Sequence, residues 1–176
     1  MLEDETDRFD LAFTELSDTE LADLGAQRFL TIDDFDLSER PDFSRPTGSK
    51  YYALGFPCNI QKKPKLGAPT VPIAMVVQTL PATFDQYHPL QVAPQSHIVL
   101  NLDRKDVSGR AGRMTAPKLN GMSGGGLWTA PRTLERHTGD ERLIAVLTEY
   151  HAGSAKVIVG TRIGILLDGI LKSLRS

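Results

Sequence analysis

The chain has 176 residues, enough for one domain or for two small lobes that share an interface. Its hydrophobic content of 40% and charged content of 24% are ordinary for a globular protein. Cys58 is the sole cysteine, which excludes an intrachain disulfide and disfavours the secreted, disulfide-rich class. No apolar run approaches the ~20 residues that span a bilayer, and the acidic N-terminus does not resemble a signal peptide. We therefore expect a cytoplasmic protein without a membrane partner.

The net charge of −2 hides an asymmetry between the two ends of the chain. Residues 1–42 carry 14 acidic and 3 basic side chains, whereas residues 43–176 carry 8 acidic and 17 basic ones. The basic residues are densest at 62–65 and 104–113. Neither stretch interleaves aromatic side chains on which bases could stack. We therefore expect solvated loops there and no nucleic-acid partner.

The N-terminal part of the chain predicts two short strands and one short helix. Residues 10–16 alternate apolar and polar, which is typical of a half-buried strand. Ser17 and Glu20 form a capping box and Gly25 supplies a C-cap, so a helix is predicted over residues 18–24. A brief strand over residues 27–32 and a connecting loop over residues 33–49 complete this part.

From residue 50 the sequence changes to short β-prone runs that are separated by turn residues. Six runs are predicted as strands, over residues 51–56, 71–80, 96–102, 125–129, 143–150 and 156–161. Several short strands with turn signals between them favour a sandwich or a barrel. The last piece places apolar residues at 163, 166, 167, 170, 171 and 174, which is one stripe of an α-helix that covers the core.

A glycine-rich loop stands before the fourth of these strands. It reads Gly121-Met122-Ser123-Gly124-Gly125-Gly126, with a single hydroxyl among the glycines. Glycine allows positive φ, so successive N–H groups can converge on one point and bind an anion, such as the oxyanion of an acyl-transfer intermediate. A serine in such a loop would be positioned to attack a carbonyl carbon.

The G-x-S-G-G spacing resembles the nucleophile loop of trypsin-like (chymotrypsin-clan) serine peptidases. By this resemblance Ser123 is the nucleophile, and the N–H groups of Gly121 and Ser123 form the oxyanion hole. Asp10, in an Asp-Leu-Ala setting, resembles the aspartate of the catalytic triad. The resemblance also implies a substrate pocket formed by Pro117 at its base together with Thr148, Tyr150 and Ile158.

The same resemblance implies a mostly β fold with a six-stranded antiparallel Greek-key barrel and a C-terminal helix. The Tyr-Tyr-Ala-Leu-Gly-Phe-Pro segment at 51–57 resembles the opening strand of the second barrel in bacterial members. Residues 50–176 would then form the second barrel, and residues 1–49 the remnant of an incomplete first barrel. The expected substrate is a peptide or protein with a small or apolar side chain at the cleavage site, and no cofactor or metal is expected.

The triad histidine is missing from its expected place. In the family it precedes the aspartate, but none of the nine residues before Asp10 is a histidine. His88, His97 and His137 are expected in loops or at strand ends, and His151 follows a strand that lines the substrate cleft in the family. We therefore expect little activity from the isolated chain, and an N-terminal half-barrel or a second copy of the chain as its partner.

Other functions compete with the peptidase interpretation. A nucleotide-binding P-loop would need Lys and Ser or Thr after its glycines, where this chain has Leu127 and Trp128. An α/β-hydrolase elbow fits G-x-S-x-G literally, but a helix should follow it and here a β-prone run does. A glycine-rich bend with an incidental serine, a non-catalytic peptide- or protein-binding module and a nucleic-acid binder also stay open.

Overall fold

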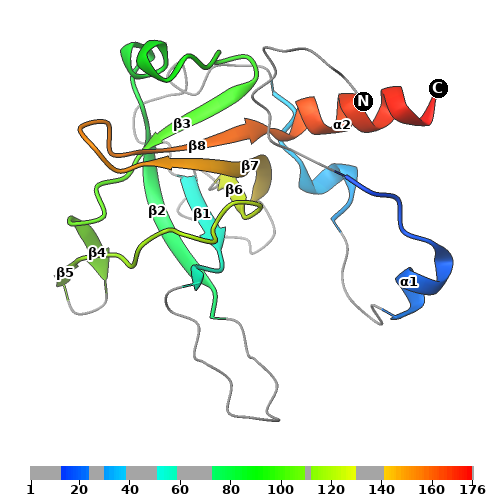
Figure 1. Cartoon of the computed structure of the whole chain (residues 1–176), viewed down its shortest axis with the longest axis horizontal. Helices are drawn as coiled ribbons and strands as arrows, with labels where there is room; N and C mark the ends of the chain where they lie inside the picture. The colour runs from blue at the N-terminus through cyan, green and yellow to red at the C-terminus, as the bar shows by residue number, and fades with distance from the viewer. Residues whose placement is uncertain are drawn as a thin grey trace, which may run out of the picture.

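The computed structural model describes residues 13–23, 30–38, 51–58, 73–109, 112–129 and 141–175. Its centre is a closed antiparallel barrel of six strands in the order β1-β2-β3-β8-β7-β6 (Figure 1). The strands are β1 (Tyr51–Gly55), β2 (Met75–Pro81), β3 (His97–Asn101), β6 (Gly126–Thr129), β7 (Arg142–His151) and β8 (Val157–Arg162). The predicted fold class, mostly β with a six-stranded antiparallel barrel and a C-terminal helix, is confirmed.

The strand order is that of a Greek key. β1, β2 and β3 follow one another, and β6 returns through a long connection to pair with β1. A small hairpin of β4 (Val107–Gly109) and β5 (Gly112–Met114) lies in this connection. This hairpin differs from the solvated loop that was expected over residues 104–113. The Ser123 loop ends this connection and leads directly into β6.

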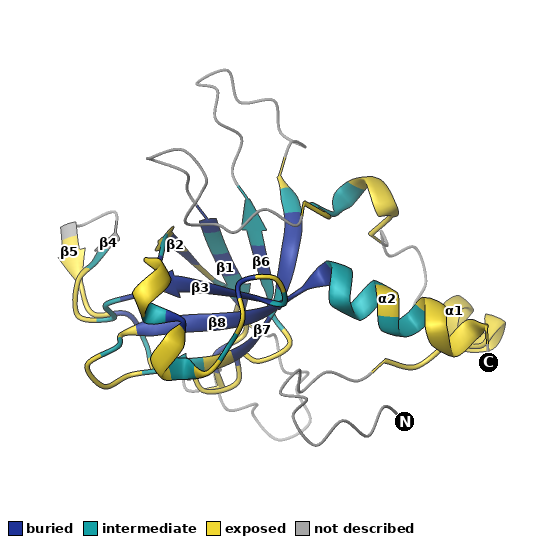
Figure 2. Ribbon diagram, turned by 90° about the horizontal axis from the view of Figure 1, so that it is seen from above, coloured by how far each residue is buried: buried dark blue, intermediate teal, exposed yellow. Residues whose placement is uncertain are grey.

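The barrel interior is filled by alternating side chains of these strands. β1 shows the period-two burial of a half-buried strand, and β8 is buried along its whole length. The side chains at the centre include Ile98, Leu100, Leu127 and Ile144, none of which is exposed. Figure 2 shows that the buried residues are concentrated in the strands.

The barrel is joined most loosely between β2 and β3, which pair only at Leu80 with Asn101 and at Pro81 with Leu100. Two short 3-10 helices, η4 (Phe84–Gln86) and η5 (His88–Leu90), follow β2 at this point. The buried Tyr87 between them accepts a hydrogen bond from the Val99 N–H at 3.1 Å. A second apolar cluster around Tyr87 therefore covers the outside of β3 and β8.

The helix α2 (Ile163–Leu174) has the predicted bounds and follows β8 away from the barrel (Figures 1 and 2). Ile163 is its one fully buried residue. At the junction, the buried Arg162 donates to the carbonyl oxygen of Pro94 at 2.9 Å and to that of Ser38 at 3.4 Å. Arg162 therefore ties the N-terminal segment to the barrel.

In the N-terminal part of the chain, the helix forms as predicted, whereas the described parts of the two predicted strands do not form. The helix α1 (Asp18–Asp23) forms with the predicted capping box, since the Glu20 carboxylate accepts from the Ser17 N–H at 2.8 Å. Residues 13–17 form no strand, and the rest of that predicted strand lies outside the described residues. In place of a strand ending at residue 32, η1 (Ile32–Asp34) forms a 3-10 turn, because Thr31 and Asp34 cap it.

Candidate active site

The Ser123 loop is fixed to the barrel by close backbone contacts. Gly121 has a φ of 87°, and a Cβ at this position would lie 3.1 Å from the backbone nitrogen of Cys58. The neighbouring carbonyl of Asn120 accepts a hydrogen bond from that nitrogen at 2.8 Å. The buried Met122 side chain joins the core cluster and packs on Gly55. The loop is therefore held on both sides of its serine.

The backbone N–H groups of the loop divide into two sets. Those of Met122, Gly124 and Gly125 donate to the carbonyl oxygens of Leu119, Leu147 and Met122, at 3.0, 2.9 and 2.9 Å. Within the described part of the chain, the N–H groups of Gly121 and Ser123 donate no hydrogen bond. Gly121 and Ser123 are both exposed residues, so these two donors can bind an oxygen atom outside the chain.

The Ser123 hydroxyl donates to the carbonyl oxygen of Thr148 at 2.9 Å. Thr148 is the extra residue of a β-bulge, because the β7–β8 register passes from Leu147 to Glu149 without it. A bulge re-aims backbone groups next to the site that they serve. No histidine among the described residues is hydrogen-bonded to the Ser123 hydroxyl. The Ser123 hydroxyl is therefore hydrogen-bonded to a neutral carbonyl acceptor and not to a general base.

A small cavity opens between the loop and the barrel interior. Its volume is about 40 Å³, which is room for a few water molecules. Its walls are apolar except at Ser123 and where β7 contributes Thr148, Glu149 and Tyr150. The apolar walls and the restricted volume fit a small, uncharged side chain.

Four residues predicted for the site line this cavity, namely Ser123, Thr148, Tyr150 and Ile158. Pro117 is not among its lining residues. Its carbonyl oxygen accepts from the Arg104 Nε at 2.6 Å, and the Ala116 carbonyl accepts from the Arg104 Nη2 at 2.8 Å. Arg104 thus fixes the segment that leads into the Ser123 loop, a role that the sequence analysis did not assign to it.

Of the other predicted site residues, Asp10 lies outside the described residues, and so does His137. His88 is exposed in η5. His97 is 5% exposed, and its Nδ1 lies 2.9 Å from the Ser96 hydroxyl. His151 lies at the end of β7, with its Nε2 2.8 Å from a carboxylate oxygen of Glu149. The role of Asp10 as a triad acid stays a prediction.

Glu149 is a site residue that the sequence analysis missed. It lines the cavity beside Ser123, and its side chain is 47% exposed. The substrate pocket expected from the sequence comprised only Pro117, Thr148, Tyr150 and Ile158. Its position directly after Thr148, in the strand expected to line the cleft, could have identified Glu149 from the sequence.

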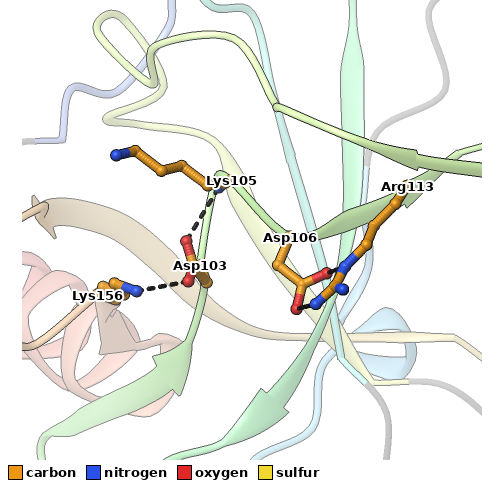
Figure 3. Close-up of polar contacts among 5 residues, drawn as sticks. All are labelled: Asp103, Lys105, Asp106, Arg113 and Lys156. Atoms are coloured by element: carbon orange, nitrogen blue, oxygen red, sulfur yellow. Dashed lines mark hydrogen bonds and ion pairs between the residues drawn. The ribbon is translucent and has the colours of Figure 1, made fainter.

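Ion pairs outside the cavity connect its supporting loops (Figure 3). Asp103, next to the cavity residue Leu102, accepts from the Lys156 ammonium at 2.5 Å and from the Lys105 N–H at 3.0 Å. Asp106 and Arg113 form a bidentate pair across the β4–β5 hairpin. The hydrogen bond from Lys156, followed by that from the Lys105 N–H, lowers the pKa of Asp103 below its ordinary value of 3.8.

This lowered pKa predicts a pH dependence of stability. A carboxyl whose pKa is lower in the folded state stabilises the fold above the unfolded pKa, and that stabilisation is lost as the pH falls through the folded value. Asp103→Asn is therefore expected to lower the melting temperature slightly at pH 7 and not at pH 2. Asp168→Asn, on the exposed side of α2, is the control. A difference between wild type and Asp103→Asn that is equal at both pH values would contradict the assignment.

The described residues contain no group of three or more His, Cys, Asp or Glu that could hold a metal ion. None of the described helices has the length and apolar character needed to cross a membrane. A scan against models of known protein families finds no match, and a search of curated proteins finds no significant relative. The function is therefore inferred from the closed barrel and from the geometry of the Ser123 loop.

Proposed function

We propose that this chain is the nucleophile-bearing part of a trypsin-like serine endopeptidase. The single observation that carries the proposal is the Ser123 loop, where the backbone N–H groups of Gly121 and of Ser123 itself have no acceptor in the described part of the chain. The Greek-key barrel supports it, because the resemblance requires this fold. In this proposal Ser123 is the nucleophile, and the Gly121 and Ser123 amides stabilise the oxyanion.

The open edge of β7 supplies a place for the peptide substrate. In the part of the chain that the structure describes, β6 pairs with β7 only as far as Val146, so residues 149–151 have β8 as their one partner strand. An extended peptide can add to such an edge through main-chain hydrogen bonds. A peptide in this position would lie beside Ser123 and the apolar cavity.

The proposed reaction is acyl transfer to the serine oxygen. Ser123 Oγ attacks the carbonyl carbon, its proton passes to a general base, and the carbonyl oxygen becomes an anion held by the two amides. The base then protonates the leaving amine, and water hydrolyses the acyl-enzyme. Because the described residues bring no histidine to Ser123, we expect little turnover by the isolated chain.

A peptide-binding module without catalysis is the second candidate. The hydrogen bond from the Ser123 hydroxyl to the Thr148 carbonyl favours it, since a hydroxyl that donates to a neutral acceptor is not activated. Both candidates use the same cleft and the same edge of β7. They differ in whether bound ligand becomes attached to Ser123.

A peptide boronic acid that ends in boroalanine separates the two candidates. Boron accepts an electron pair from Ser123 Oγ, the hydroxyl proton leaves to solvent, and a tetrahedral anion forms without turnover. We expect the full-length chain to show tetrahedral boron by ¹¹B NMR, and Ser123→Ala to show none. The control is Ser154→Ala, in the exposed turn before β8.

Two results would contradict the peptidase proposal. One is a tetrahedral adduct that persists unchanged in Ser123→Ala. The other is equal affinity for the boronic acid and for the peptide amide that lacks boron, which would support the binding module.

A further inference from the structure

Glu149 provides the one carboxylate on the lining of the Ser123 cavity among the described residues. The remaining lining residues are apolar, or carry a hydroxyl group as Ser123, Thr148 and Tyr150 do. A carboxylate at the rim of an apolar pocket attracts a cationic group that lies next to the group filling the pocket. The cavity therefore combines two different recognition elements.

The Glu149 carboxylate is held in place by His151. The two side chains lie two residues apart and therefore on the same face of β7, with Glu149 Oε2 2.8 Å from His151 Nε2. Their exposed fractions are 47% and 37%. Exposed pairs of polar side chains contribute little to stability. Because the Glu149 side chain is 47% exposed, its carboxylate stays accessible to a ligand. Substitution of Glu149 should not unfold the barrel.

We propose that Glu149 selects peptides that carry Lys or Arg about one or two residues from the bond presented to Ser123. This inference rests on the proposed peptide cleft. Glu149 directly follows Thr148, whose carbonyl lies 2.9 Å from the Ser123 hydroxyl oxygen, and residues advance ~3.3 Å along a strand. A peptide paired to the open edge of β7 would thus pass Glu149 just beyond the attacked bond. Glu149 is thus a specificity residue for the peptide.

The test uses acetylated tripeptide boronic acids that end in boroalanine, which fixes their register on Ser123. One series carries lysine at each preceding position in turn, and a matched series carries norleucine, which has a similar length and no charge. Isothermal titration calorimetry on the full-length chain is expected to give about fivefold tighter binding of one lysine peptide. The preference should weaken at high salt, because the pair is exposed to solvent.

Three variants complete the experiment. Glu149→Gln should remove the lysine preference while the norleucine affinity stays unchanged, and Glu149→Lys should prefer a glutamate peptide. Glu141→Gln, just before β7 and far along the strand from the cavity, is the control and should keep the preference.

The outcomes separate this inference from the proposed function. Equal affinity for lysine and norleucine peptides that both form the adduct would overturn the role of Glu149 and leave the peptidase proposal standing. A lysine preference that survives in Glu149→Gln would also overturn it. Absence of any adduct in both series would overturn the proposed function, and this inference with it.

Discussion

Replacing Gly125 with alanine is expected to destabilise the barrel by about 3 kcal/mol or more. A Cβ at Gly125 would lie 2.3 Å from the carbonyl oxygen of Leu54 and 2.9 Å from that of Met122. Both neighbours are backbone atoms, so no side-chain rotation can relieve the overlap. The Gly125 carbonyl also accepts from the Leu147 N–H at 2.7 Å, which links the loop to β7. Urea denaturation measures the loss.

Gly153→Ala is the matched control for this variant. Gly153 lies in the turn after β7, and a Cβ there would have no atom within 4 Å. Its free energy of unfolding should stay within about 0.5 kcal/mol of wild type. A Gly125→Ala protein as stable as Gly153→Ala would show that β1 and the loop are not packed as described.

Replacing Gly121 with alanine is expected to weaken the boronate adduct about tenfold or more. Gly121 has a φ of 87°, where an L-residue with a Cβ is strained by ~1–2 kcal/mol, and the added Cβ would also press on the Cys58 backbone. Both effects move the Gly121 N–H away from the oxygen that it should bind. Titration of the boronic acid, followed by ¹¹B NMR, measures the change.

Gly124→Ala separates misplacement of the Gly121 amide from general strain. Gly124 has a φ of 83°, but a Cβ there would meet no atom within 4 Å, and its N–H already donates to Leu147. We therefore expect a similar backbone strain with a smaller loss of adduct affinity. Equal losses in the two variants would contradict a specific role for the Gly121 amide.

The barrel and its helix could be predicted from the sequence because burial there follows simple periodicity. The buried β8 begins with three consecutive apolar β-branched residues, Val157 to Val159, and the stripe in α2 repeats at helical spacing. The β4–β5 hairpin was missed, because each of its strands has three residues and one large apolar side chain, Val107 or Met114, which is too short for a periodic pattern. The strand predicted over residues 10–16 does not form in its described part, residues 13–16, since alternation alone does not supply a partner strand.

The candidate site could be predicted in part. The G-x-S-G-G spacing located the loop, and three of the four predicted substrate-contact residues, Thr148, Tyr150 and Ile158, line the cavity with Ser123. The bulge that turns the Thr148 carbonyl toward Ser123 depends on the register between β7 and β8, which no local pattern reveals. Glu149 and Arg104 were missed for the same reason, because their contacts join segments distant in the sequence.

In the proposed mechanism the amides of Gly121 and Ser123 together bind a negatively charged oxygen next to the Ser123 hydroxyl. Two-dimensional ¹⁵N–¹H NMR of the full-length chain with and without the boroalanine peptide tests it most directly. We predict that the Gly121 and Ser123 amide protons shift furthest downfield, while those of Met122, Gly124 and Gly125 move little. An adduct that leaves the Gly121 and Ser123 amides unshifted would contradict the claim.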